Sequence, residues 1–184
     1  NHIIQIKRAV LPIIFIPGIM GSVLFTDQGG KYQKIWSPED PIFMLKNYFS
    51  TFNSPSSKRE FLIGSENFSS DRLYVRGRND VHSKQNGWEG VAKNFYGRFL
   101  QHLYEYSWPI LIQACFHLPI HAFGYNWTAS NTDSAKKLSS YINALMDMYR
   151  KDGRKINHVI LVTHSMGGLV AREYCANHHG ADKV

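Results

Sequence analysis

The feature that most constrains the fold lies near the end of the 184-residue chain, where a β-prone run leads into a turn of small residues and then a helix. Residues 159–163 read Val-Ile-Leu-Val-Thr, a continuous apolar run typical of a parallel strand buried on both faces. His164, Ser165 and Met166 follow, and a glycine pair then opens a helical pattern. A strand, a tight turn and a helix in this order push one serine hydroxyl clear of the sheet.

Strand and helix signals alternate along the rest of the chain. We expect further strands at residues 10–16, 121–125 and 181–184, and helices at residues 87–106, 134–151 and 166–177. In the first of these helices, the side chains expected to share the apolar face are Val91, Phe95, Phe99, Leu103 and Tyr104. The candidate caps of the second helix are Thr132, Asp133 and Ser134. This alternation predicts an α/β fold, with a mostly parallel sheet and helices on both faces.

Ser165 is our candidate for an acyl-transfer nucleophile. The residues two before and two after such a serine must be small because they pack across the turn, and here they are Thr163 and Gly167. The helix that follows places the positive end of its dipole near a developing oxyanion. The alternative is that Ser165 only caps the helix. A cap does not require His164 before the serine and Met-Gly-Gly after it.

A second segment, Ile-Pro-Gly-Ile-Met-Gly-Ser at residues 16–22, follows the first expected strand. An acyl-transfer enzyme usually stabilises its tetrahedral oxyanion with two backbone N–H groups. One belongs to the residue after the nucleophile, here Met166. The other comes from a loop after an earlier strand, and by position that donor is Ile19. We therefore expect Ile19 and Met166 to form the oxyanion hole.

Residues 26–86 do not fit the strand–helix alternation. They combine Ser, Asn, Gly and Pro with many aromatic residues, and a structureless loop of that length is improbable in a compact domain. We interpret them as an insertion with short elements of its own, lying over the carboxyl edge of the sheet. It forms either a small satellite core or a lid with an acyl-chain site. The candidate substrate contacts are Trp36, Phe43, Tyr48 and Phe49.

Composition narrows the classes of partner. Lys and Arg outnumber Asp and Glu by 21 to 14, which favours anionic partners such as phospholipid headgroups and membrane surfaces. The basic residues form no run longer than a pair, and no nucleic-acid-binding signature is recognised, so we expect no nucleic-acid partner. Cys115 and Cys175 have no metal-site spacing and are expected to be buried small apolar residues. We predict no metal and no cofactor.

Together, residues 16–22 and 163–170 resemble α/β-hydrolase lipases of the lecithin–cholesterol acyltransferase and GPI inositol-deacylase type. Residues 123–130, Phe-Gly-Tyr-Asn-Trp-Thr-Ala-Ser, look like the Tyr-Asp-Trp-Arg stretch of those enzymes, with Asn126 and Thr128 as departures. The combination also looks like bacterial lipase effectors delivered by type VI secretion. The resemblance implies a lipase or phospholipase that uses no cofactor. It further implies secretion, or delivery to a target-cell periplasm or membrane, and an immunity or inhibitor protein as partner.

In this fold the triad acid and histidine follow the serine, on loops after later strands. Only 19 residues follow Ser165 here, so we expect both groups outside the chain, on a C-terminal half in the same gene or on a second chain. Residues 1–184 are then the N-terminal portion of one hydrolase domain. His164, His178 and His179 are not expected to substitute. Two alternatives to a lipase remain: a lipid acyltransferase, and a non-catalytic binding module on a hydrolase scaffold.

Overall fold

The computed structural model describes residues 8–28, 31–49, 54–63, 73–75 and 86–184. Its central sheet has the strand order β7 (Ile120–Ala122), β2 (Ile13–Ile16) and β8 (Ile160–Thr163), and all three strands are parallel. A second parallel pair, β1 (Ala9–Val10) with β6 (Phe116–His117), lies at the amino-terminal end of β2. The parallel sheet and the positions of these strands confirm the predicted α/β class.

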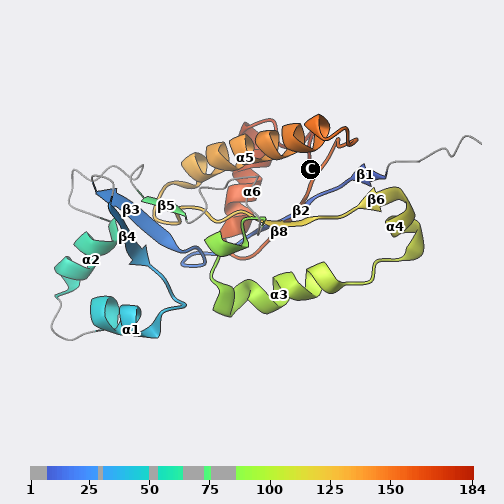
Figure 1. Ribbon diagram of the computed structural model, residues 1–184. Helices are drawn as coiled ribbons and strands as arrows, with labels where there is room; N and C mark the ends of the chain where they lie inside the picture. The colour runs from blue at the N-terminus through green and yellow to red at the C-terminus, as the bar shows by residue number, and fades with distance from the viewer. Residues whose placement is uncertain (1–7, 29–30, 50–53, 64–72, 76–85) are drawn as a thin grey trace, which may run out of the picture.

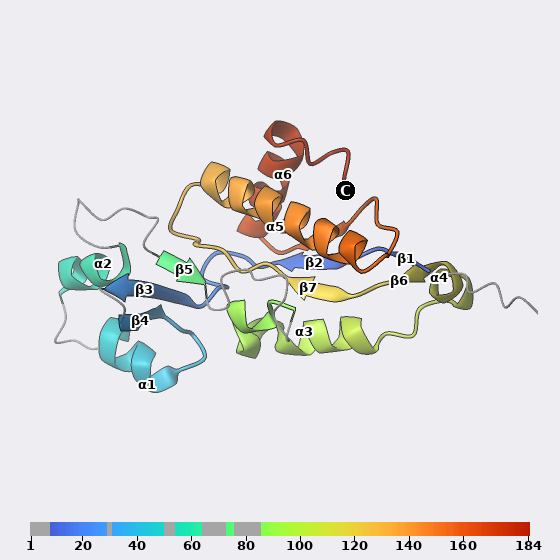
Figure 2. The ribbon, with the colours of Figure 1, turned by 45° about the horizontal axis from the view of Figure 1, so that its top comes forward.

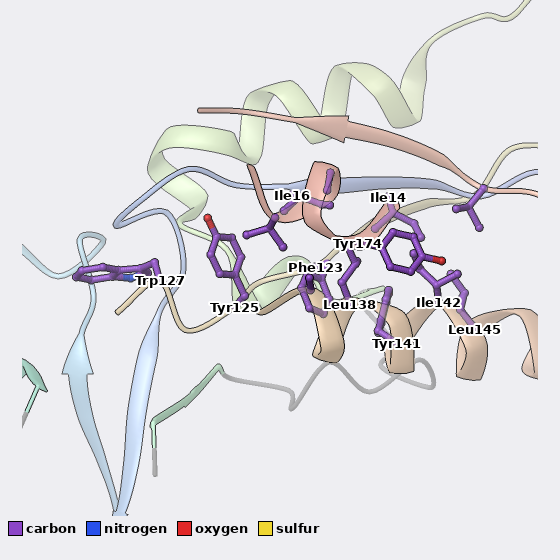
Figure 3. Close-up of a cluster of buried hydrophobic side chains, with 14 of the residues drawn as sticks. Ile14, Ile16, Phe123, Tyr125, Trp127, Leu138, Tyr141, Ile142, Leu145 and Tyr174 are labelled. Carbon is purple, nitrogen blue, oxygen red and sulfur yellow. The ribbon is translucent and has the colours of Figure 1, made fainter. Parts of the chain in front are cut away.

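Helices cover both faces of this sheet, with α5 (Asn131–Lys151) and α6 (Met166–Asn177) on one side and α3 (Lys93–Glu105) on the other (Figures 1 and 2). The sequence of β2 is continuously apolar because both faces of the strand are buried. Ile14 and Ile16 join the core under α5 and α6, whereas Ile13 and Phe15 join the core under α3. Figure 3 shows the first of these cores, with Tyr174 and Leu138 packed beneath β2.

A second sheet lies beyond the carboxyl ends of the central strands (Figure 1). It is antiparallel, in the order β4 (Lys31–Trp36), β3 (Leu24–Gln28) and β5 (Leu73–Val75). The helices α1 (Pro41–Met44), η1 (Leu45–Phe49, a π-helix) and α2 (Pro55–Ile63) follow β4. Parts of the expected insertion, residues 29–30, 50–53, 64–72 and 76–85, lie outside the described residues. Its boundaries and its role as a lid stay predictions.

The predicted apolar face of α3 was partly wrong. The helix begins at Lys93, after a 3₁₀ turn, η3 (Trp88–Gly90), rather than at residue 87. Its inward residues are Tyr96, Leu100 and Leu103, whereas Phe95 and Phe99 are exposed. Tyr96 and Leu100 therefore replace Phe95 and Phe99 on the inward face, Leu103 was predicted correctly, and Tyr104 is exposed.

Three smaller predictions also fail. Ser130, and not a residue of 132–134, caps α5, because its hydroxyl accepts the N–H of Asp133 at 3.0 Å. Residues 181–183 form a turn rather than a strand, closed by the N–H of Lys183 donating to Gly180 at 2.9 Å. Cys115 is exposed on the short helix α4 (Ile110–Cys115) instead of buried. Within the described ranges, no helix is both long and apolar enough to cross a membrane.

Candidate active site

Ser165 occupies the junction between β8 and α6 in a strained backbone conformation. Its φ is 51° and its ψ is −123°, a combination that costs a non-glycine residue about 1–3 kcal/mol. The side chain is exposed and makes no capping hydrogen bond to α6. These features argue against the helix-cap interpretation, since a cap residue normally has an extended backbone and uses its hydroxyl on the helix.

The small residues of the turn have separate partners. A Cβ built on Gly167 would lie 2.5 Å from the carbonyl oxygen of Ile16, so only glycine fits there. A Cβ on Gly168 would lie 3.4 Å from Thr163 Oγ1, an ordinary contact. Gly167 thus packs against the end of β2, and Gly168 lies beside Thr163.

The loop at residues 17–22 lies against this turn. A Cβ on Gly18 would meet His164 Nδ1 at 2.9 Å and the Cβ of Ser165 at 3.1 Å. The N–H of His164 donates to the carbonyl of Ile16 at 3.0 Å. Residues 16–22 and 163–168, far apart in sequence, are therefore brought together beside Ser165.

Aromatic side chains from separate segments hold this loop by its backbone. The Tyr125 hydroxyl donates to the carbonyl of Pro17 at 3.1 Å, and Trp36 Nε1 donates to that of Met20 at 2.9 Å. Met20 itself has a φ of 62°, which is uncommon for a non-glycine residue and consistent with a loop fixed by its surroundings. The buried Ser22 accepts the N–H of Tyr125 at 3.0 Å. The loop is thus pre-shaped by the protein.

The two candidate oxyanion donors are Ile19 and Met166. Ile19 sits at the tip of the loop with its side chain 53% exposed. Met166 is the first residue of α6, where a helix leaves its N–H groups without internal partners. Among the described residues, neither N–H donates to a backbone carbonyl. Ile19 and Met166 therefore remain candidate donors.

The candidate substrate contacts divide into packed and exposed side chains. Trp36 is buried, and its ring lies 5.2 Å from those of Tyr48 and Trp127, centroid to centroid. Phe43 and Tyr48 are half-buried against the same core, and the Tyr48 hydroxyl donates to the carbonyl of Ile35. Phe49 is 67% exposed. Trp36 thus belongs to the main core, Phe43 and Tyr48 pack against it, and of the four only Phe49 is open to solvent.

Ionisable groups near Ser165 are few in the part of the chain that the structure describes. His164 Nδ1 contacts the Tyr96 hydroxyl at 3.0 Å. His178 lies at the far end of α6, 3.8 Å from a carboxylate oxygen of Glu173. No hydrogen bond between Ser165 and a histidine or carboxylate, and no cluster of three metal-binding side chains, is found among the described residues.

Sequence reasoning missed Tyr96, Tyr125 and Trp127 as residues that hold the loop. Tyr96 accepts the N–H of Gly18 at 3.2 Å, and Trp127 Nε1 donates to the carbonyl of Ser22 at 3.4 Å. Tyr125 and Trp127 stood in the Gly-Tyr-Asn-Trp stretch, which was noted only for its resemblance. Tyr96 had no signal of its own, since it is one of several aromatic residues on an amphipathic helix.

Comparisons with known proteins match different parts of this chain. A family model described as a PGAP1-like alpha/beta domain matches residues 112–184, which include the turn at Ser165 but not the loop at 17–22. A putative GPI inositol-deacylase C of Yarrowia lipolytica (strain CLIB 122 / E 150) is 45% identical over 40 residues, or 22% of this chain and 5% of that protein.

Among solved structures, a chain in the crystal structure of the Tle4–Tli4 complex matches with a TM-score of 0.64 and 24% identity. The match covers 92% of this chain and 43% of that one, so this chain spans less than half of either relative. The chain has the α/β-hydrolase fold and resembles α/β-hydrolase lipases of the GPI inositol-deacylase type.

Proposed function

We propose that the protein is a serine hydrolase that cleaves carboxyl esters of lipids through an acyl-enzyme on Ser165. The observation that carries this proposal is the strained backbone of Ser165, with φ 51° and ψ −123°, at a strand–helix junction where its exposed hydroxyl makes no capping bond. Strain of this size persists where the surrounding structure holds it, and it clusters at catalytic sites.

The proposed reaction has two steps. A general base takes the proton of the Ser165 hydroxyl as Oγ attacks the ester carbonyl, and the resulting oxyanion is bound by the N–H groups of Ile19 and Met166. The carbonyl re-forms, the C–O bond to the alcohol breaks, the protonated base gives its proton to the leaving alcohol, and the acyl group stays on Oγ. The same base then takes a proton from water as the water attacks the acyl carbonyl, and it returns that proton to Oγ as the fatty acid leaves.

We place the base and its acid partner outside residues 1–184. In the α/β-hydrolase fold these groups follow the nucleophile on later loops. Two placements support this proposal: His164 Nδ1 lies 3.0 Å from the Tyr96 hydroxyl, and His178 lies at the opposite end of α6 from Ser165.

A lipid substrate is supported by the apolar surface around the site. Ile19, Met20 and Leu169 are large apolar residues that lie beside Ser165 in the sequence or across the turn, and each is about half exposed. Ile42, Leu45 and Phe49 add exposed apolar side chains on α1 and η1, in the unit that supplies Trp36 to the loop. Such surface is costly in water and suits an acyl chain or a lipid interface.

Two wider expectations remain part of the proposal. The Tle4–Tli4 structure contains a second protein, which supports the idea that this protein also binds an inhibitor or immunity partner. Secretion, or delivery to a target-cell periplasm or membrane, likewise remains proposed.

The test is ester hydrolysis by the full-length protein that contains this chain. Ser165→Ala should lower turnover by about 10⁶-fold, the cost of removing a triad serine, with unchanged thermal stability. Ser140→Ala, on an exposed face of α5, is the matched control and should retain full activity. Activity of the Ser165→Ala variant above a tenth of the wild-type value would overturn the proposal.

A further inference from the structure

We infer that Tyr96 is a positioning residue that holds the loop at residues 17–22, our candidate oxyanion loop, against the turn at residues 164–166 that carries Ser165. Its hydroxyl lies between two groups on opposite sides of the candidate site. The N–H of Gly18, in the loop, donates to the Tyr96 oxygen at 3.2 Å. The same hydroxyl lies 3.0 Å from Nδ1 of His164, the residue before Ser165. This role rests on the proposed function, because it concerns the geometry of acyl transfer.

The direction of the second bond depends on the His164 tautomer, and we assign the Tyr96 hydroxyl as its donor. A tyrosine hydroxyl has one proton to donate and lone pairs to accept with. Since the Gly18 N–H occupies an acceptor position, the Tyr96 proton is free to point at His164 Nδ1. The neutral imidazole then carries its own proton on Nε2. The chain of bonds runs from the Gly18 N–H, through the Tyr96 hydroxyl, to His164 Nδ1.

This bridge has two consequences for the site. It occupies the N–H of Gly18, so that the next N–H in the loop, that of Ile19, is the one left for an oxyanion. It also engages His164, which keeps this imidazole on the loop side of the turn and away from the role of base. The donors on Ile19 and Met166 therefore keep a fixed relation to Ser165.

The ring of Tyr96 is held independently of its hydroxyl. Its centroid lies 4.9 Å from that of Phe15 on β2 and 5.8 Å from that of His164. A Cβ on Gly21 would lie 2.9 Å from the ring, so the loop also packs against it. Tyr96→Phe keeps these contacts and removes only the bridging oxygen, which makes it the informative substitution.

The experiment compares the full-length wild type with Tyr96→Phe and with Tyr104→Phe, a matched control at an exposed tyrosine of the same helix. The readouts are kcat and KM on a short soluble ester, and the rate at which a fluorophosphonate labels Ser165. In labelling, Oγ displaces fluoride from phosphorus, its proton passes to the base, and the phosphonyl oxygen occupies the oxyanion position. Thermal melting verifies that each variant is folded.

Displacing a reacting group by about 1 Å costs roughly 100-fold, so we expect Tyr96→Phe to lower kcat and the labelling rate between about 10-fold and 100-fold. KM should change little because the loss falls on the transition state. Tyr104→Phe should behave as wild type. Equal labelling and kcat in wild type and Tyr96→Phe would overturn the inference and leave the proposed function intact. A wild-type protein that is not labelled on Ser165 would overturn both.

A second measurement is made first on the wild-type protein, so it does not require that the Tyr96→Phe variant folds. The ¹⁵N chemical shifts of the neutral His164 imidazole in the wild type report which nitrogen carries the proton. The assigned direction requires the proton on Nε2, and a proton on Nδ1 would overturn that direction by making His164 the donor to the Tyr96 oxygen. In Tyr96→Phe, loss of the donor should allow a mixture of the two tautomers, a change that a purely structural role for the tyrosine ring would not produce.

Discussion

Gly167 lies so close to Ile16 that a Cβ on the glycine would meet the carbonyl oxygen of the isoleucine at 2.5 Å. The same Cβ would lie 2.6 Å from the carbonyl oxygen of Pro17. The start of α6 therefore packs directly against the end of β2 and against Pro17, the first residue of the loop at residues 17–22. This contact sets the distance between the loop and Ser165.

Gly167→Ala should therefore destabilise the protein more than Gly168→Ala. The new methyl group of Gly167→Ala meets backbone atoms that have little room to move, and we expect a loss of about 3 kcal/mol in the free energy of unfolding. At Gly168 the neighbour is a side-chain oxygen at 3.4 Å, and alanine also favours the helix, so the change should be small. Urea unfolding of the two variants compares them directly, and equal losses would contradict this packing.

Trp36→Phe tests whether the second sheet supports the oxyanion loop. The substitution removes the Nε1 bond to Met20 but keeps an aromatic ring, and we expect kcat to fall about tenfold with the loop no longer fixed. Trp88→Phe is the control, because it removes an equivalent bond from Nε1 to the carbonyl of Ile120 at 3.1 Å, away from the loop. Both should cost about 1–2 kcal/mol of stability. Similar kcat values for the two variants would count against the role of Trp36.

The exposed apolar side chains of α1 and η1 should matter only for substrate in a lipid surface. Ile42 and Leu45 are 80% and 63% exposed, and replacing both with serine should weaken hydrolysis of phospholipid vesicles while sparing a short soluble ester. The control is the same pair of changes at Ile110 and Leu111, 82% and 76% exposed on α4 at the other end of the sheet. Equal vesicle activities in the two double variants would argue against an interfacial role.

His121 should make the protein less stable in acid. Burial, with a smaller contribution from the charge of His117, lowers its pKa from 6.5 to about 4, and its two ring nitrogens face the hydroxyls of Tyr149 and Tyr141. Between these pH values the unfolded chain binds a proton that the folded chain does not. The stability contribution is therefore present above pH 6.5 and falls towards pH 4, by up to about 3 kcal/mol.

Chemical denaturation across this pH range, for wild type and His121→Gln, is the corresponding measurement. The substitution removes the titrating group, so the stability of the variant should depend less steeply on pH than that of the wild type. Parallel profiles for the two proteins would show that His121 does not carry this dependence.

The sequence allowed prediction of those parts of the site that depend on local patterns. The strand, the turn at Ser165 and the helix after it are contiguous, and the continuous apolar run of β2 identifies a strand buried on both faces. The same prediction was wrong for β8, which lies at the edge of the described sheet and is exposed at Ile160 and Thr163. Helix caps and helix faces were less predictable. The 3₁₀ turn at Trp88–Gly90 shifts the start of α3, and a shift of one residue exchanges Phe95 for Tyr96 on the inward face.

Contacts set by topology were not predictable from one sequence. Tyr96 and His164 are separated by 68 positions and meet only because α3 crosses the sheet beside β2. Trp36 reaches Met20 from the second sheet, through a pairing of β3 and β4 that aromatic density alone does not specify. These residues shape the loop without matching a catalytic motif, which is why motif reading located Ser165 but not the residues that support it.

The most direct measurement of the central claim is mass spectrometry of the full-length protein after reaction with a fluorophosphonate. Trypsin, which cleaves after Lys155 and Arg172, releases residues 156–172, a peptide whose only serine is Ser165. We predict that this peptide gains the mass of the phosphonyl group, that fragmentation places the group on Ser165 rather than Thr163, and that loss of esterase activity follows the same time course. An unmodified peptide from a protein that has been fully inactivated by the probe would contradict Ser165 as the nucleophile.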